Sequence, residues 1–289
     1  MNRRTSTNRV RFGHLEFVKV NANGQDVRDL YHWTLTLSWF RFAGLILAIY
    51  LAVNLAFSVL YFMDRGSIAE SHSFADDFFF SIETLATVGY GHLYPQTLYG
   101  HIISTIEIMT GMFGMAVTTG LIFIRFSRPV ARIVFSRNLV VSPSDGKLAL
   151  MLRVANLRQH AMAEAEFRLM LIRKERIKEG QEERRFYPLT LQFDRLIAFP
   201  VALTLRHIID EKSPLYGLTA RDLEECGARV LASVVCIDTV IPASVQSQQD
   251  YTWRDIQFGK RFAEIYSELD DRRMTVDYGR LDELEDVPS

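Results

Sequence analysis

Five consecutive residues in the first third of the chain have types and spacing suited to binding a dehydrated cation: Thr87, Val88, Gly89, Tyr90 and Gly91. Glycine adopts backbone angles that are closed to other residues, so Gly89 and Gly91 allow consecutive carbonyl oxygens to point toward one axis. A column of such oxygens can replace the water shell of a potassium ion, and the Thr87 hydroxyl can add one more oxygen layer. Val88 and Tyr90 would then pack behind this segment. The alternative is an ordinary glycine turn.

The surroundings of this segment favour a filter over a turn. Residues 42–63 contain no charged residue and residues 102–124 contain only Glu107, so each stretch is about long enough to cross a bilayer as a helix. Residues 78–87 are apolar but too short to span, which indicates a re-entrant element. The segment TVGYG also resembles the selectivity-filter sequence of potassium channels.

The distribution of basic residues predicts the orientation. Basic residues precede the first apolar stretch at Arg3, Arg4, Arg9, Arg11, Lys19 and Arg28, and follow the second at Arg125, Arg128, Arg132 and Arg137. The loop between the stretches carries Asp64, Glu70, Asp76 and Asp77 against Arg65. The positive-inside rule therefore places both termini in the cytoplasm. The net charge of −1 argues against general nucleic-acid binding, and no helix has the periodic arginines of a voltage sensor.

We expect three regions along the chain. Residues 1–37 form a cytoplasmic N-terminus, in which 25–37 are either an amphipathic helix at the membrane interface or the start of the first span. Residues 38–126 form the pore domain, with a first span over 40–63, a pore helix over 75–86, the filter over 87–91 and a second span over 101–126. Residues 127–289 form a cytoplasmic β-sandwich, because many short strands with turn signals indicate one.

The strand-like region can be divided further. Residues 163–173 alternate, with Ala165, Phe167, Leu169 and Leu171 on one face. Strands are also predicted over 148–155, 189–193, 199–205, 230–237, 262–266 and 274–278. A helix is predicted over 219–225, with Thr219 as its N-cap.

Four segments of this region resemble the cytoplasmic domain of inward-rectifier potassium channels: residues 153–158 (RVANLR), 207–216 (HIIDEKSPLY), 259–262 (GKRF) and 276–278 (VDY). The resemblance runs from about residue 27 to residue 278 and is greatest to the prokaryotic inward rectifiers, the KirBac family. It implies a homotetramer in the bacterial inner membrane that conducts potassium passively, with two membrane helices per chain, an interfacial helix and an immunoglobulin-like β-sandwich. It implies no cofactor, with magnesium, barium and polyamines as candidate blockers.

The resemblance also assigns roles around the filter. Gly111, Met115, Thr119 and Phe123 recur every four residues and share one helix face, which alone could be a packing face. In this family it is similar to the pore-lining face, with Phe123 at a hydrophobic constriction that gates by dewetting. Met115 stands where strongly rectifying relatives carry an acid. Glu83 is expected to brace the filter through hydrogen bonds.

Other charged residues receive less specific predictions. Glu107, within the second span, is either a proton-sensitive site or, as we favour, a hydrogen-bonded packing residue. Glu164 and Asp255 match positions that line the cytoplasmic vestibule of relatives. Arg125, Arg128 and Arg132 form a basic cluster that suits anionic lipid headgroups, or they are ordinary positive-inside charge.

Two other functions stay open at this point. One is a membrane-anchored sensor with a vestigial pore, and the other is a non-selective cation channel. The chain lacks a Walker loop, GxSxG, HExxH and the Rossmann glycine pattern, so the sequence does not indicate an enzyme.

Overall fold

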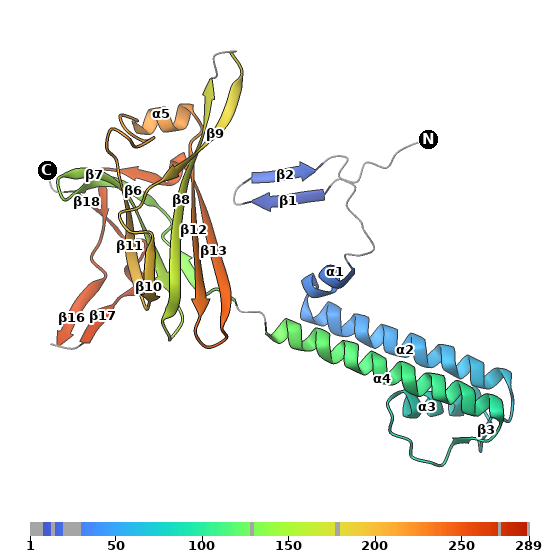
Figure 1. Ribbon diagram of the computed structural model, residues 1–289. Helices are drawn as coiled ribbons and strands as arrows, with labels where there is room; N and C mark the ends of the chain where they lie inside the picture. Colours follow the sequence, from blue (N-terminus) through green and yellow to red (C-terminus); the bar gives the residue numbers. More distant parts are fainter. Residues whose placement is uncertain are drawn as a thin grey trace. The chain divides into compact units, whose positions relative to one another are not determined.

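The computed structural model describes residues 8–12, 15–19, 30–127, 130–176, 180–270 and 273–287. The chain divides into two compact units, Asn23–Arg128 in one, and Met1–Ala22 with Pro129–Ser289 in the other. Arg128 and residues 25–29 of the expected amphipathic segment lie outside the described residues. Each unit is considered by itself below (Figure 1).

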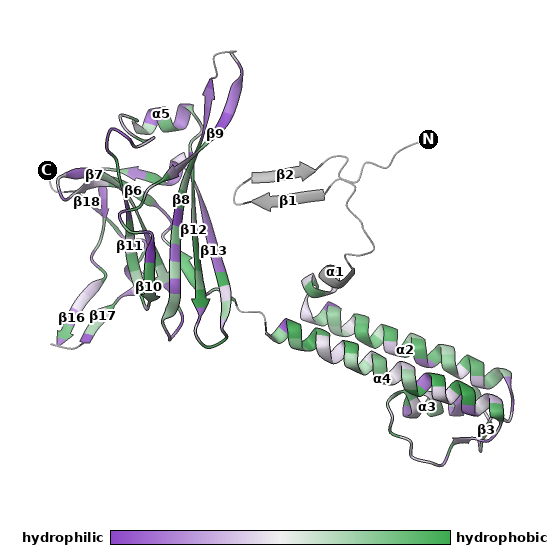
Figure 2. Cartoon of the chain, viewed as in Figure 1, coloured by the Kyte–Doolittle hydropathy of each residue, from purple (hydrophilic) through white to green (hydrophobic). Residues whose placement is uncertain are grey.

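Four helices form the first unit, which we call the pore unit. They are α1 (Leu30–Thr36), α2 (Trp39–Met63), α3 (Phe74–Leu85) and α4 (Leu98–Phe126). The helices α2 and α4 are long and apolar enough to cross a membrane, and both are coloured as hydrophobic along most of their length in Figure 2. The described part of the expected amphipathic segment forms α1, a helix separate from α2. The break lies at Ser38, whose hydroxyl accepts a hydrogen bond from the Arg41 N–H and caps α2.

Short strands connect the loops at the C-terminal end of α2. The pair β3 (Ile68–Ala69) and β4 (Tyr94–Pro95) is antiparallel. The Tyr99 hydroxyl donates to the Leu60 carbonyl at 3.1 Å. These contacts connect the segments before α3 and before α4 to the end of α2.

Two five-stranded sheets form the β-sandwich of the second unit. The first sheet has the order β10 (Arg195–Phe199), β8 (Met162–Arg176), β12 (Arg229–Asp238) and β13 (Ala243–Thr252), with β9 (Glu182–Leu189) also paired to β8. The second has the order β11 (Ala202–Ile208), β7 (Lys147–Asn156), β6 (Leu139–Ser144) and β14 (Ile256–Phe258), with β5 (Ile133–Phe135) also paired to β7. All these pairs are antiparallel except β14 with β6.

Smaller elements accompany the two sheets. They are the pairs β1 (Asn8–Phe12) with β2 (Leu15–Lys19), β15 (Lys260–Phe262) with β18 (Leu284–Asp286) and β16 (Tyr266–Asp270) with β17 (Arg273–Val276), and the short helices α5 (Ala220–Glu225), η2 (Trp253–Asp255) and η3 (Tyr278–Arg280). The predicted cap of α5 is present, because the Thr219 hydroxyl accepts a hydrogen bond from the Asp222 N–H.

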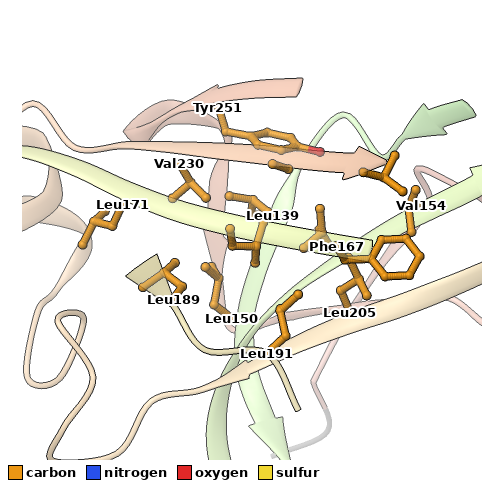
Figure 3. Close-up of a cluster of buried hydrophobic side chains, with 14 of the residues drawn as sticks. Leu139, Leu150, Val154, Phe167, Leu171, Leu189, Leu191, Leu205, Val230 and Tyr251 are labelled. Carbon is orange, nitrogen blue, oxygen red and sulfur yellow. The ribbon is translucent and has the colours of Figure 1, made fainter. Parts of the chain in front are cut away.

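The core of the sandwich lies between the two sheets (Figure 3). Alternation along β8 buries Phe167, Leu169 and Leu171, and the facing sheet contributes residues such as Leu150 and Leu205. Each fully buried side chain of this size stabilises the fold by roughly 1.5–3 kcal/mol. The sequence prediction of a two-span membrane pore domain followed by a C-terminal β-sandwich is confirmed.

Several predicted strands are wrong in their bounds. Residues 190–193 leave the sheet after β9, so the strand predicted over 189–193 is absent. The strand predicted over 199–205 is two strands, because Pro200 has no N–H to donate to a ladder. The strand predicted over 262–266 is likewise divided between β15 and β16. The sequence analysis missed β13, which is mostly polar.

Candidate ion-conduction site

The backbone of the filter segment alternates between two conformations. The φ angles of Thr87, Gly89 and Gly91 are 56°, 55° and 86°, whereas Val88 and Tyr90 do not have positive φ. This alternation turns successive carbonyl groups toward the same side, which an extended strand cannot do. Within the described residues, no hydrogen bond reaches the carbonyl oxygen of any of these five residues. The segment therefore offers a run of free acceptors to a cation.

Thr87 adopts its conformation at a cost. A β-branched residue with positive φ is a genuine outlier, and such strain costs on the order of 1–3 kcal/mol. The Thr87 N–H donates to the Thr84 carbonyl at 3.0 Å, which helps to hold it. The sequence analysis assigned special backbone angles to the two glycines only, and it missed Thr87 because residue type alone does not predict a strained threonine.

The helix α3 leads directly into the filter. Ser73 and Asp76 form a capping box at its start. At its end the Glu83 carbonyl accepts hydrogen bonds from the N–H groups of Val88 (2.8 Å) and Gly89 (3.4 Å). Glu83 thus contacts the filter through its main chain, and the expected bracing by its side chain stays a prediction. The C-terminal carbonyls of a helix carry partial negative charge, which favours a cation nearby.

A buried polar cluster joins α2, α3 and α4 behind the filter. Glu107 is fully buried. The Tyr61 hydroxyl donates to one Glu107 oxygen at 2.6 Å, and the Ser81 hydroxyl donates to the other. The Asn54 amide, also fully buried, donates to the Tyr50 carbonyl at 2.7 Å. These hydrogen bonds agree with the favoured interpretation of Glu107 as a hydrogen-bonded packing residue, and the proton-sensitive alternative stays a prediction.

Gly111 lets α4 pack tightly against the end of α3. A Cβ atom there would lie 2.2 Å from the Leu85 carbonyl oxygen, whereas one at Gly114 or Gly120 would meet nothing within 4 Å. Gly111, Met115 and Thr119 all line an apolar groove of about 410 Å³ between α2, the end of α3 and α4. Phe123, one helical step further, is 70% exposed in the single chain.

Arg125 is engaged inside the pore unit. Its guanidinium donates to the carbonyls of Thr34 and Leu37, both at 2.8 Å. It also lies over the rings of Trp39 and Phe42, 4.7 and 4.5 Å from their centroids. This arginine fastens the end of α4 to the joint between α1 and α2. These contacts give Arg125 a structural role within the pore unit, and its predicted role in binding lipid headgroups stays a prediction.

Comparisons with known proteins agree with this architecture. Residues 47–128 match a family model described as an ion channel, and residues 133–289 match the C-terminal domain of inward rectifier potassium channels. The chain is 38% identical to the inward rectifier potassium channel Kirbac3.1 of Paramagnetospirillum magnetotacticum, over 89% of this chain and 88% of that relative. The chain belongs to the inward-rectifier potassium channel family.

More distant relatives extend the comparison. The chain is 31% identical to the human G protein-activated inward rectifier potassium channel 1 over 77% of its length, but it spans less than half (46%) of that relative. It is 28% identical to the human ATP-sensitive inward rectifier potassium channel 12, over 96% of this chain and 69% of the relative. The sequence-based assignment to the inward rectifiers is confirmed.

The structure does not bring the two predicted vestibule residues of this inward rectifier into contact. Glu164 lies exposed in β8 with a φ of 48°, beside the register shift between β8 and β12. The Asp255 carboxylate accepts hydrogen bonds from the N–H and hydroxyl of Thr252, so it caps η2. Arg132 is exposed, and Arg128 lies outside the described residues.

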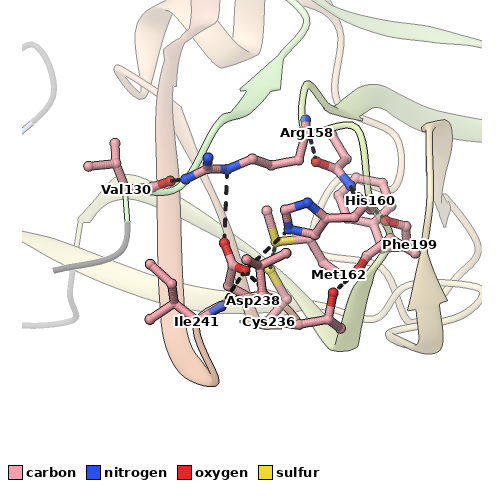
Figure 4. Close-up of polar contacts among 12 residues, drawn as sticks. Val130, Arg158, His160, Met162, Phe199, Cys236, Asp238 and Ile241 are labelled. Carbon is pink, nitrogen blue, oxygen red and sulfur yellow. Dashed lines mark hydrogen bonds and ion pairs between the residues drawn. The ribbon is translucent and has the colours of Figure 1, made fainter. Parts of the chain in front are cut away.

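The sequence analysis also missed a charged cluster of the sandwich (Figure 4). Asp238, nearly fully buried, accepts hydrogen bonds from the N–H groups of Val240 (2.9 Å) and Ile241 (3.2 Å). Its carboxylate also contacts His160 at 3.2 Å and Arg158 at 3.9 Å. Arg158 in turn donates to the Val130 carbonyl at 2.8 Å. The cluster therefore fastens the start of the second unit to the β8–β12 sheet.

Proposed function

We propose that four copies of this chain form a passive, potassium-selective pore in the bacterial inner membrane, with both termini in the cytoplasm. The observation that carries this proposal is the alternating backbone of residues 87–91, whose carbonyls lack hydrogen-bond partners among the described residues. One chain offers acceptors on one side of an ion only. Four-fold repetition supplies the ring of oxygens that replaces a hydration shell, with the Thr87 hydroxyls as a further layer.

We assign the gate to the inner end of α4. Phe123 is a large apolar side chain that remains 70% exposed in one chain. Four such rings form an apolar collar that closes the pore by dewetting, and the β-sandwich and membrane lipids set its opening. Met115, which we assign to the pore-lining face, carries no charge, so block by magnesium or polyamines is weak in this channel.

Charges outside the filter modulate the pore in this proposal. Four copies each of Glu164 and Asp255 add negative charge along the cytoplasmic path and concentrate cations. Arg132 is the described arginine that supports lipid binding, because it is exposed while Arg125 is engaged by α1 and α2. Anionic lipids are therefore the expected lipid partners.

The test is rubidium uptake into liposomes that carry the full-length protein, with potassium, sodium and barium as competitors. We expect potassium and barium to block uptake and sodium to leave it unchanged. Gly89→Asp should abolish uptake, because a side chain at φ +55° is strained and distorts the carbonyl column. The matched control is Gly146→Asp, the same change at a glycine of φ +74° in the exposed turn between β6 and β7.

The outcomes separate the alternatives. Native mass measurement of each variant distinguishes a blocked tetramer from a protein that fails to assemble. Equal competition by sodium would indicate a non-selective cation channel. No uptake by the wild type in any lipid mixture, anionic mixtures included, would indicate a sensor with a vestigial pore.

A further inference from the structure

A second polar site lies within the β-sandwich and includes none of the residues assigned to conduction. It is a groove of about 480 Å³ on the outer face of the β11–β7–β6 sheet, beside residues 261–266. Its polar lining is formed by Ser142, Arg153, Thr204, Arg206, Arg261, Glu264 and Tyr266. Three arginines against one carboxylate make this lining positively charged.

The register of the sheet explains why these side chains meet. Arg153 of β7 lies opposite Thr204 of β11, and Arg206 lies opposite Met151. Residues two apart on a strand share a face, so the two arginines occupy neighbouring rows of the same face. The intervening residues Leu152 and Leu205 point into the core on the other side. The arginines are therefore fixed by strands and do not belong to a loop.

Three donors in this groove lack partners. The Ser142 hydroxyl, Arg153 Nε and Arg206 Nε are all shielded from solvent, and none has a hydrogen-bond partner in the described part of the chain. Ser142 is 1% exposed and Arg153 is 4% exposed. A buried polar group without a partner costs about 1–3 kcal/mol. Folded proteins rarely leave such groups unpaired, and a bound water or ion is the usual explanation.

The charges of the groove are only partly compensated. Arg261 pairs with Glu285 at 2.9 Å, and the outer nitrogens of Arg153 donate to the carbonyls of Ala263 and Arg280. Arg206 makes no ion pair among the described residues. Burial lowers the pKa of Arg153 and the nearby Glu264 carboxylate opposes this effect, yet an arginine remains charged in either case.

We propose that this groove binds a small phosphate-bearing anion. Arginine presents a planar set of donors that matches phosphate oxygens, and it is the preferred residue for such recognition. The volume lies within the range of about 300–1,000 Å³ that is typical of small-molecule sites, so it holds more than a few waters. A phosphate in the groove would accept hydrogen bonds from the guanidinium of Arg206, which is the main contact, and its charge would offset the positive charge of the lining.

The proposal is independent of potassium conduction and is tested by binding. Calorimetric titration of pyrophosphate into the full-length protein, held in neutral-lipid nanodiscs at constant ionic strength, should show saturable binding. Arg206→Gln should weaken it by about tenfold or more, because one charge-assisted contact is lost. Arg195→Gln is the matched control: it makes the same charge change at an exposed arginine of β10, in the other sheet, and should bind as the wild type does.

A further variant and a second lipid composition help to interpret the binding result. Arg206→Lys keeps the charge but loses the planar fork, and it should bind more weakly than the wild type even if Arg206→Gln fails to fold. Nanodiscs with phosphatidylglycerol identify the source of the phosphate: unchanged affinity indicates a soluble anion, and reduced affinity indicates competition by a lipid headgroup. Absence of binding, or equal binding by the wild type and both Arg206 variants, would overturn the proposal.

Discussion

The pore unit and the β-sandwich differ in how much of their apolar surface is buried within one chain. Only 17% of the most apolar stretch of α2 and 6% of that of α4 are buried in the single chain. The sandwich encloses a continuous core from both of its sheets, in which Leu139, Leu150, Leu152 and Leu171 are fully buried. The filter carbonyls have no hydrogen-bond partners among the described residues, whereas the buried Asp238 and His207 of the sandwich have partners within their own unit.

The difference shows where each unit obtains its stability. The sandwich is held by burial inside the chain, as in a soluble domain. In the proposed tetramer, lipid and further copies of the chain would cover the apolar faces of the pore unit, and ions would occupy its carbonyls. Substitutions in the pore unit should therefore change assembly and flux first, and substitutions in the sandwich should change thermal stability first.

The largest expected effect is at Gly111. Gly111→Ala places a methyl group 2.2 Å from the Leu85 carbonyl oxygen, so α3 must shift and move the filter that follows it. Overpacking of this kind costs about 1–3 kcal/mol, and we expect rubidium uptake to be lost or strongly reduced. Gly114→Ala is the control, because its new methyl group meets nothing within 4 Å. Equal uptake by the two variants would mean that this contact does not position the filter.

The next largest effect is expected at Glu107, a fully buried carboxylate in the mostly apolar pore unit. Glu107→Leu removes the acceptor of the buried Tyr61 hydroxyl and one acceptor of the Ser81 hydroxyl, which keeps Asn54 as a partner. Each unpaired group costs about 1–3 kcal/mol, so the melting temperature of the full chain should fall more than in Tyr61→Phe, which removes one partner only. Thr105→Ala, on the exposed side of the same helix, should change little. A melting temperature unchanged by Glu107→Leu would show that lipid and neighbouring copies, not this cluster, stabilise the pore unit.

How much could be predicted from sequence also differs between the two units. In the pore unit, hydropathy indicates two spans and a shorter element between them, and glycine chemistry indicates the filter. The cluster of Asn54, Ser81 and Glu107 was not predicted, because its members lie on three helices and only packing brings them together. The inward role of Arg125 was not predicted for the same reason.

In the sandwich, alternation identified β8, where one face is apolar. It failed for β13, whose buried residues include only two apolar side chains, Val245 and Tyr251. The family resemblance gave Asp255 a vestibule role, which stays a prediction, and it did not indicate the local cap that the Asp255 carboxylate forms with Thr252. Periodicity reports burial, and it carries little information where hydrogen bonds to a neighbouring strand hold a polar segment in place.

A smaller effect is expected at Asp238, the buried charge of the sandwich. The N–H of Val240, followed by that of Ile241 and by His160, holds the pKa of this carboxyl below its usual value near 3.8. A lowered pKa stabilises the fold at higher pH, and this contribution is lost as the pH falls through the lowered pKa. Asp238→Asn should therefore cost about 1–2 kcal/mol at pH 7 and progressively less in acid. The melting temperatures of variant and wild type, compared from pH 7 to pH 3, measure this, and a constant difference would contradict the assignment.

The smallest effect is expected at His207. Its Nδ1 lies 2.7 Å from the Thr190 carbonyl, which can only accept, so Nδ1 carries the proton and Nε2 accepts from the Ser213 hydroxyl at 2.8 Å. Burial lowers the pKa of His207 below its usual value of 6.5, so the unfolded chain binds a proton more readily and stability falls as the pH drops below about 6.5. His207→Asn, whose amide can replace the Nδ1 donor, should reduce this loss of stability between pH 7 and pH 5.5. If the melting temperatures of both proteins fall equally between pH 7 and pH 5.5, the acid sensitivity does not arise from His207. The sandwich would then depend less on its local hydrogen bonds than the contrast with the pore unit implies.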